Sequence, residues 1–308
     1  MSKFSASDAA FVGFRLVREH PRTVAVWAVL MTVLSLMTST LTIKLAGPQL
    51  TEFMALSADN EASPDAMFKV MGGLLPLMVV SMVYSVALYS VMLAAVNRMV
   101  LRPEDNRSFY LRLGADEMRQ AGALVLVSLT LLGIYFAAVL VSAILLGIGV
   151  AAGGGAMTGL AGLISFVGVA CLMIYFTIRL SFASTMTFDT GRIAVRASWA
   201  LTKGHVGAIL GAYVLATVMA LIVYLLIMTI VAAVGVIVSG GISGISGLGG
   251  LFEPDMTSLE TFFTPIGLAR AAFAGVISVL TSLIMFSPAP EIYRILKAGG
   301  AEPVAPSV

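Results

Sequence analysis

The chain has 308 residues, of which 59% are hydrophobic and only 11% charged, and its 18 Lys and Arg nearly balance its 16 Asp and Glu. Soluble domains carry roughly a quarter charged residues, so this composition argues strongly against a water-soluble fold. The single cysteine, Cys171, excludes a disulfide framework and a zinc site built from several cysteines.

Long stretches without Asp, Glu, Lys, Arg or His predict six transmembrane helices. The five uncharged stretches are residues 23–43, 70–97, 120–178, 206–252 and 271–290. About 20 apolar residues cross the hydrocarbon core, so the third stretch has room for two crossings around a glycine-rich turn at 151–159. The predicted fold class is an all-α membrane protein with spans near 22–46, 67–98, 121–150, 157–182, 205–238 and 266–296.

The basic residues predict the orientation of these spans. Six spans place both termini on one side, and of the 18 Lys and Arg only Lys44, Lys69 and Arg270 fall near the other side. Because cytoplasmic loops are enriched in Lys and Arg, both termini are expected to be cytoplasmic, in a bacterial plasma (inner) membrane. The outer connections at 47–65, 151–159 and 239–265 are too short for a folded domain.

A basic segment precedes the first, third and fifth spans. Its two basic residues stand seven apart each time: Arg15 and Arg22, Arg112 and Arg119, Arg196 and Lys203. Seven residues are almost two helical turns, so each pair shares a helix face, and Arg112 can also pair with Asp116. The pattern predicts three cytoplasmic amphipathic helices that turn basic faces toward anionic headgroups, with Trp199 as an interfacial aromatic. A general headgroup anchor is favoured over a specific lipid site.

The even-numbered spans end in similar strings, AVNRMVL, FTIRLSF and EIYRILK. Their fourth residues are Arg98, Arg179 and Arg294, which are expected to extend toward the headgroups. The single membrane domain, residues 1–308, is therefore interpreted as three candidate repeats, 6–101, 107–186 and 190–298, followed by a disordered tail at 299–308. Excess basic residues on the cytoplasmic side can produce the same pattern without repetition, so that alternative stays open.

No predicted span carries an ionisable side chain near its midplane, which argues against proton or ion coupling. The second span has a polar stripe: Ser81, Tyr84, Ser85, Tyr89 and, nearer its end, Asn97. Such a stripe lines a polar pathway in some proteins, but more often it makes hydrogen bonds between helices. We favour the second interpretation.

Signatures of enzymes and metal sites are absent from the sequence. There is no GxSxG, HExxH or P-loop motif, and two histidines, His20 and His205, are too few for a zinc site. The glycine-rich stretch 239–250 lacks the lysine of a phosphate loop and is expected to be a flexible or re-entrant connection. Pro288 and Pro290 predict a kink in the sixth span. We expect no catalytic residue, no metal and no cofactor.

Three segments carry a resemblance to a known group of proteins: FRLVREHPRTVAVW (14–27), YLRLGADEMRQ (110–120) and SWALTKGH (198–205). With them the chain resembles poorly characterised bacterial six-span membrane proteins, relatives of the membrane domain of some glycerophosphodiester phosphodiesterases. The resemblance implies a plasma-membrane protein with an envelope- or lipid-related role. No phosphodiesterase catalytic domain accompanies these segments, so it does not imply that activity.

Two functional hypotheses follow. The first is a non-enzymatic membrane protein that acts through lipids, chiefly anionic headgroups, or through a membrane-protein partner or a second copy of itself, in envelope or lipid homeostasis or in assembly. The alternative is a facilitator or channel for a small or amphipathic solute. Nothing in the sequence points to nucleic acid.

Overall fold

The structure is a computed structural model that describes residues 5–58, 63–238 and 258–298. In these ranges the backbone forms helices and turns, without a β-strand. Six of the described helical segments are long and apolar enough to cross a membrane. The all-α, six-span prediction is confirmed, and the chain is a multi-pass membrane protein. The glycine-rich stretch 239–250 and the predicted disordered tail 299–308 lie outside the described residues.

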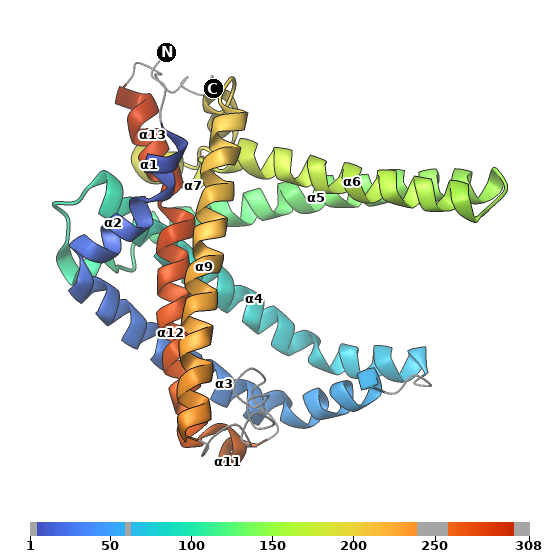
Figure 1. The fold of residues 1–308 in the computed structure, drawn as a ribbon, viewed down its shortest axis with the longest axis horizontal. Helices are drawn as coiled ribbons and strands as arrows, with labels where there is room; N and C mark the ends of the chain where they lie inside the picture. Colours follow the sequence, from blue (N-terminus) through green and yellow to red (C-terminus); the bar gives the residue numbers. More distant parts are fainter. Residues whose placement is uncertain (1–4, 59–62, 239–257, 299–308) are drawn as a thin grey trace. The chain divides into compact units, whose positions relative to one another are not determined.

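Figure 1 shows the helices in chain order. They are α1 (Ala6–Ala10), α2 (Val12–Glu19), α3 (Pro21–Ala58), α4 (Pro64–Leu101), the short turn η1 (Arg107–Tyr110), α5 (Ala115–Ala151), α6 (Gly155–Leu180), α7 (Ala183–Thr190), α8 (Val195–Leu201), α9 (Val206–Val238), α11 (Leu259–Phe262), α12 (Pro265–Phe286) and α13 (Pro288–Ala298).

The chain divides into two compact units. Unit 1 takes its residues from 1–12, 86–215 and 286–308, and unit 2 takes its residues from 13–85 and 216–285. The basic segments before the third and fifth spans and the last turns of α4 and α6 all belong to unit 1. Unit 1 therefore holds most of the charged side chains that the sequence singles out.

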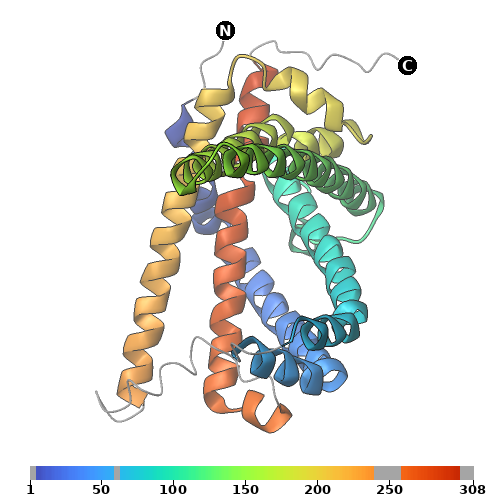
Figure 2. The ribbon, with the colours of Figure 1, turned by 90° about the vertical axis from the view of Figure 1, so that its right-hand side faces the viewer.

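In unit 1, α5 and α6 form an antiparallel hairpin and lie side by side in both views (Figure 1, Figure 2). The turn between them contains Gly153 and Gly154 at φ values of +98° and +151°. Residues other than glycine rarely adopt such φ values, so the turn requires glycine. A Cβ on Gly149 would lie 3.2 Å from the Met157 carbonyl oxygen, which shows how closely the two helices approach. The predicted glycine-rich turn is confirmed.

In unit 2, α3 continues well past the predicted end of the first span and reaches Ala58. The prediction of a loop from residue 47 onward is therefore wrong for the described part of that segment. The reason is apolar packing: Leu50, Phe53 and Leu56 contact a buried cluster that includes Val70 and Leu74 of α4. These side chains extend the hairpin beyond the stretch that hydropathy alone identifies.

Two glycines allow close backbone contacts in unit 2. A Cβ on Gly275 of α12 would lie 2.2 Å from Thr32 Oγ1 and 2.8 Å from the Ala28 carbonyl oxygen, both in α3. A Cβ on Gly13 of α2 would lie 2.6 Å from Ile284 Cα. Small residues at such positions let membrane helices pack at short range, so α2 and α3 are both fitted to α12.

The sixth span is broken where the prolines predict it. Helix α12 ends at Phe286, Ser287 lies between the helices, and α13 begins at Pro288. Proline suits the first position of a helix because its missing N–H has no partner there anyway. The predicted kink is confirmed, and it makes α13 a separate helix of unit 1.

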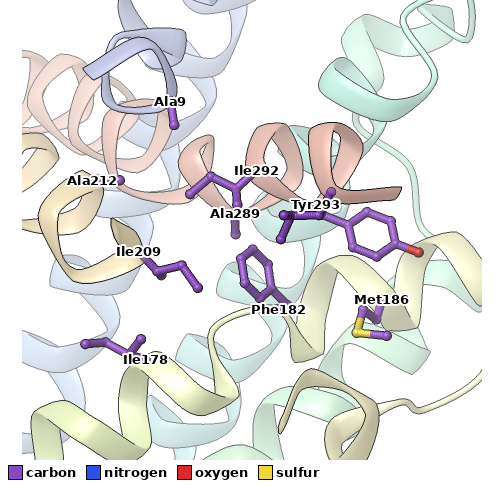
Figure 3. Close-up of a cluster of buried hydrophobic side chains, with 10 residues drawn as sticks. Ala9, Ile178, Phe182, Met186, Ile209, Ala212, Ala289, Ile292 and Tyr293 are labelled. Atoms are coloured by element: carbon purple, nitrogen blue, oxygen red, sulfur yellow. The ribbon is translucent and has the colours of Figure 1, made fainter. Parts of the chain in front are cut away.

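The core of unit 1 is a cluster of buried apolar side chains (Figure 3). It joins Ala9 of α1, residues of α6, α7, α9 and α13, and the α6–α7 junction: Ile178, Phe182, Met186, Ile209, Ala212, Ala289, Ile292, Tyr293 and Leu296. Figure 3 shows Phe182 in the middle of this cluster, facing α13. The cluster holds the ends of several helices together and so positions the polar groups around it.

The three basic segments differ in local structure. Arg15 of the first lies in the separate helix α2, but Arg22 lies in the first turn of α3. Arg196 of the third lies in the separate helix α8, but Lys203 lies beyond its end at Leu201, so neither basic pair shares one helix as predicted. The second is different because α5 begins only at Ala115, after Gly114, and then runs on as a membrane helix. Arg112 therefore precedes the helix, and the predicted separate helix with an Arg112–Asp116 pair is wrong.

A candidate site at the helix ends of unit 1

Arg98, in the last turn of α4, is almost fully buried, with 2% of its side chain exposed. Its Nη2 lies 2.8 Å from Glu117 Oε1, 3.7 Å from an Asp116 oxygen, and its Nε lies 4.0 Å from an Asp105 oxygen. Its Nη1 donates to the Tyr110 carbonyl at 2.6 Å. A buried charge is stable only when it is paired and hydrogen-bonded, and Arg98 satisfies both conditions.

Arg98 also stabilises an unusual turn between α4 and α5. Ser108, Phe109 and Tyr110 have φ values of 52°, 54° and 65°, in the left-handed region that residues other than glycine rarely adopt. The hydrogen bond from Arg98 to the Tyr110 carbonyl and another from the Tyr110 hydroxyl to the Pro103 carbonyl hold the turn. The strain of this turn is therefore offset by contacts to the end of α4.

The other arginines of the second basic segment are paired with acids as well. Arg112 binds Asp105, and Arg119 donates to Asp116 at 3.0 Å. The hydrogen bond from Arg112 is the main reason that the pKa of Asp105 is lowered from its ordinary value of 3.8. The positive charge of this segment is largely neutralised within the protein.

Helix α7 connects these charges to α13. The Phe188 ring lies under two guanidinium groups, 5.4 Å from that of Arg98 and 4.7 Å from that of Arg102. The neighbouring Asp189 accepts hydrogen bonds from the Tyr293 hydroxyl at 2.6 Å and from Lys297 Nζ at 2.7 Å. Cation–π contacts and a hydrogen-bonded ion pair thus hold α4, α7 and α13 together.

A buried hydrogen-bond network lies next to Arg98. Ser184 of α7 accepts from Asn97 Nδ2 at 3.0 Å and donates to Gln120 Oε1 at 2.6 Å. Thr185 donates to Asn97 Oδ1, and Gln120 Nε2 donates to the Ser184 carbonyl. In both amide side chains the oxygen and the nitrogen each have a hydrogen-bond partner. The network therefore interlocks α4, α5 and α7 and explains Asn97 as a structural residue.

Arg179, in the last turn of α6, makes a second centre. Its Nη1 donates to the Trp199 carbonyl and to Thr202 Oγ1, both at 3.1 Å. Ser198 Oγ donates to the Arg179 carbonyl at 2.8 Å and accepts from the Phe182 N–H at 3.1 Å. These bonds join the end of α6 to α8, which carries no acidic residue.

The Arg179 guanidinium lies against aromatic rings instead of carboxylates. It is 4.2 Å from the centroid of a Trp199 ring and 5.6 Å from that of Tyr175. In the part of the chain that the structure describes, Arg179 makes no ion pair with Asp or Glu, and its buried Nε has no hydrogen-bond partner. Arg98 and Arg179 therefore occupy similar places and have different electrostatic surroundings.

The predicted site residues fall into three groups. Arg98 and Arg179 are buried and do not extend toward headgroups, whereas Arg294 is 53% exposed and pairs with Glu291 of its own helix. The first and third basic segments keep exposed side chains: Arg15, Arg22, Arg196, Trp199 and Lys203. In the polar stripe of α4, Ser81 and Tyr89 are exposed, and Tyr84 and Ser85 are half-buried.

Sequence patterns did not identify several residues that the fold brings together. Glu117, Gln120 and Ser184 are examples, because each becomes important only through a contact with a residue more than 15 positions away. One signal was available: Asp116 lies between Arg112 and Arg119, whereas no acid lies between Arg196 and Lys203. An acid between two basic residues indicates local pairing, and this distinguishes the second segment from the third.

No group of three or more His, Cys, Asp and Glu side chains within 5–58, 63–238 and 258–298 is arranged to hold a metal ion. The carboxylates of Asp105, Asp116 and Glu117 gather around Arg98, whose positive charge occupies the place that a cation would take. No family model, no curated protein and no solved structure matches the chain.

Proposed function

We propose that the protein is a non-enzymatic inner-membrane protein that acts through anionic lipids, or through partner proteins that meet it at the membrane surface, in envelope or lipid homeostasis. The carrying observation is the contrast between two basic segments. Arg112 and Arg119 are paired with acids, whereas Arg192, Arg196 and Lys203 around α8 are exposed in a stretch without Asp or Glu from 190 to 205. Exposed basic residues next to membrane helices attract anionic headgroups.

The proposed orientation places both termini and all three basic segments at the cytoplasmic face. The excess of Lys and Arg at these ends supports it, because such residues are retained on the cytoplasmic side. In this orientation α2 and α8 lie in the headgroup layer. The three candidate repeats belong to the same proposal. Arg98 and Arg179 each bind the basic segment that follows their own span. Helix α13, which carries Arg294, packs against α1 at the start of the first candidate repeat.

Quenching of tryptophan fluorescence by brominated lipids tests the lipid proposal. Trp199 is 38% exposed on α8, whereas Trp27 is fully buried. In proteoliposomes, brominated phosphatidylglycerol should quench more strongly than brominated phosphatidylcholine at equal content. Changing Arg192, Arg196 and Lys203 to Gln should remove that difference, because the charges that attract the anionic lipid are gone.

The matched control is the Arg112→Gln/Arg119→Gln variant, which alters two basic residues whose charges acids already neutralise. It should keep the preference of the wild-type protein. Equal quenching by the two lipids in the wild-type protein contradicts the proposal.

A solute facilitator is the second candidate function. Ser81 and Tyr89 of α4 are exposed, so their hydroxyl groups are available to a polar solute. Osmotic swelling of proteoliposomes in small polyols and sugars distinguishes the two functions. The lipid proposal predicts swelling rates equal to those of empty vesicles. A facilitator predicts faster swelling that a Ser81→Val/Ser85→Val variant slows.

A further inference from the structure

The three basic segments share a longer pattern than their paired basic residues. Each has an aspartate seven residues before its first basic residue, at Asp8, Asp105 and Asp189. The segments therefore align without gaps as Asp-x6-Arg-x6-Arg/Lys. In this alignment Asp116 and Glu117 of the second segment correspond to Ala200 and Leu201 of the third.

The alignment identifies what Arg179 lacks. Arg98 precedes the second segment and is neutralised by Glu117 at 2.8 Å, with Asp116 at 3.7 Å. Arg179 precedes the third segment and also binds a backbone carbonyl of it, at Trp199. At the two positions that supply carboxylates to Arg98, the third segment has Ala and Leu.

An uncompensated guanidinium is costly in this place. Arg179 is 7% exposed, and within the described residues it has only neutral partners. Burying a charge without a counter-charge is strongly unfavourable, so an anion bound there would stabilise the fold. Among the described residues no group accepts a hydrogen bond from the guanidinium edge formed by Nε and Nη2, and this edge suits the paired oxygens of a phosphate.

We propose that Arg179 is the base of a binding site for the phosphate group of an anionic membrane lipid. Trp199, whose ring lies 4.2 Å from the guanidinium and is partly exposed, forms the wall of the site. Arg196, one turn before Trp199 on α8, stands at its rim and attracts the headgroup. The inference rests on the proposed function, and it assigns that function to one defined site.

Native mass spectrometry of the full chain in detergent tests the site, with phosphatidic acid as the probe. Diacylglycerol, which has the same tails without the phosphate, and inorganic phosphate are the reference ligands. The key variant is Ala200→Asp, which supplies the carboxylate that the second segment has at Asp116, at an exposed position that tolerates it. Ala200→Asn is the matched neutral control.

Ala200→Asp should weaken binding of phosphatidic acid at least about tenfold, since charge-assisted hydrogen bonds to the phosphate are lost to an internal ion pair. Ala200→Asn should bind as the wild-type protein does, and diacylglycerol should not bind measurably. Should Ala200→Asp fail to fold, Arg196→Gln at the exposed rim is expected to weaken binding a few-fold.

Equal binding of phosphatidic acid by Ala200→Asp and Ala200→Asn overturns the site, as does binding of diacylglycerol as tight as that of phosphatidic acid. Binding of inorganic phosphate as tight as that of the lipid overturns the assignment to a lipid. In each case a persistent preference for brominated phosphatidylglycerol would leave the proposed function standing, so the two failures are distinguishable.

Discussion

Arg98 occupies a position where a membrane protein ordinarily extends a basic side chain toward the headgroups, yet its guanidinium is directed inward against Glu117. The difference arises from residues downstream. The strained turn at 108–110 returns the chain so that the first turn of α5 places carboxylates beside the end of α4. An arginine at the end of a span can therefore extend toward the headgroups or be buried in an ion pair. The acids that follow it in the sequence decide which of the two occurs.

Arg98→Met is expected to lower the free energy of unfolding by about 3–5 kcal/mol, because it leaves Glu117 buried without a counter-charge. Unfolding in detergent, followed by circular dichroism, measures the change. Arg119→Met is the control: Arg119 is 40% exposed and its partner Asp116 is 30% exposed, so its loss should cost no more than about 1 kcal/mol. Equal effects of the two substitutions would show that Arg98 is not stabilised as described.

Asp105 gives a pH-dependent test. Its hydrogen bond with Arg112 lowers the pKa of Asp105 below 3.8 in the folded protein. A lowered pKa contributes stability that is present above the unfolded value and is lost as the pH falls through the folded value. Carboxyl-carbon NMR should find the midpoint below 3.8 and should find it raised in Arg112→Gln. An unchanged midpoint in that variant would contradict the assigned pair.

At the scale of helices, hydropathy predicted the spans well because a membrane helix is defined by its own composition. The glycine turn at 151–159 and the break at Pro288 were predictable for a similar reason, since glycine and proline act on the local backbone. The extension of α3 to Ala58 depends on contacts with another helix. So does the burial of Arg179, and a pattern within one segment does not contain such information.

The close contact of α12 with α3 gives a test at this scale. Gly275→Ala should destabilise unit 2 by about 1–3 kcal/mol, because the new Cβ would overlap the Thr32 hydroxyl and the Ala28 carbonyl. Gly168→Ala in α6 is the matched control, because a Cβ added there would meet no neighbouring atom within 4 Å. It should be neutral or stabilising by up to about 1 kcal/mol. Thermal unfolding of both variants in one detergent measures the difference, and equal losses would contradict the close packing.

At the scale of the whole molecule, orientation joins the basic segments to the proposed function. Cytoplasmic reporter fusions at either end of the chain should be active, and a reporter that requires export should be active when inserted between α3 and α4. Arg98, Arg179 and Arg294 would then all lie toward the cytoplasmic leaflet. The opposite pattern of reporter activity would place α8 on the outer face and remove it from the anionic lipids proposed for it.

The most direct measurement of the central claim is the lipid composition that surrounds the protein when a polymer extracts it from its own membrane without detergent. The exposed basic residues around α8 predict enrichment of anionic lipids over the bulk membrane, and the variant with Arg192, Arg196 and Lys203 changed to Gln should lose most of it. A composition equal to that of the bulk membrane in the wild-type protein would contradict a function exerted through anionic lipids.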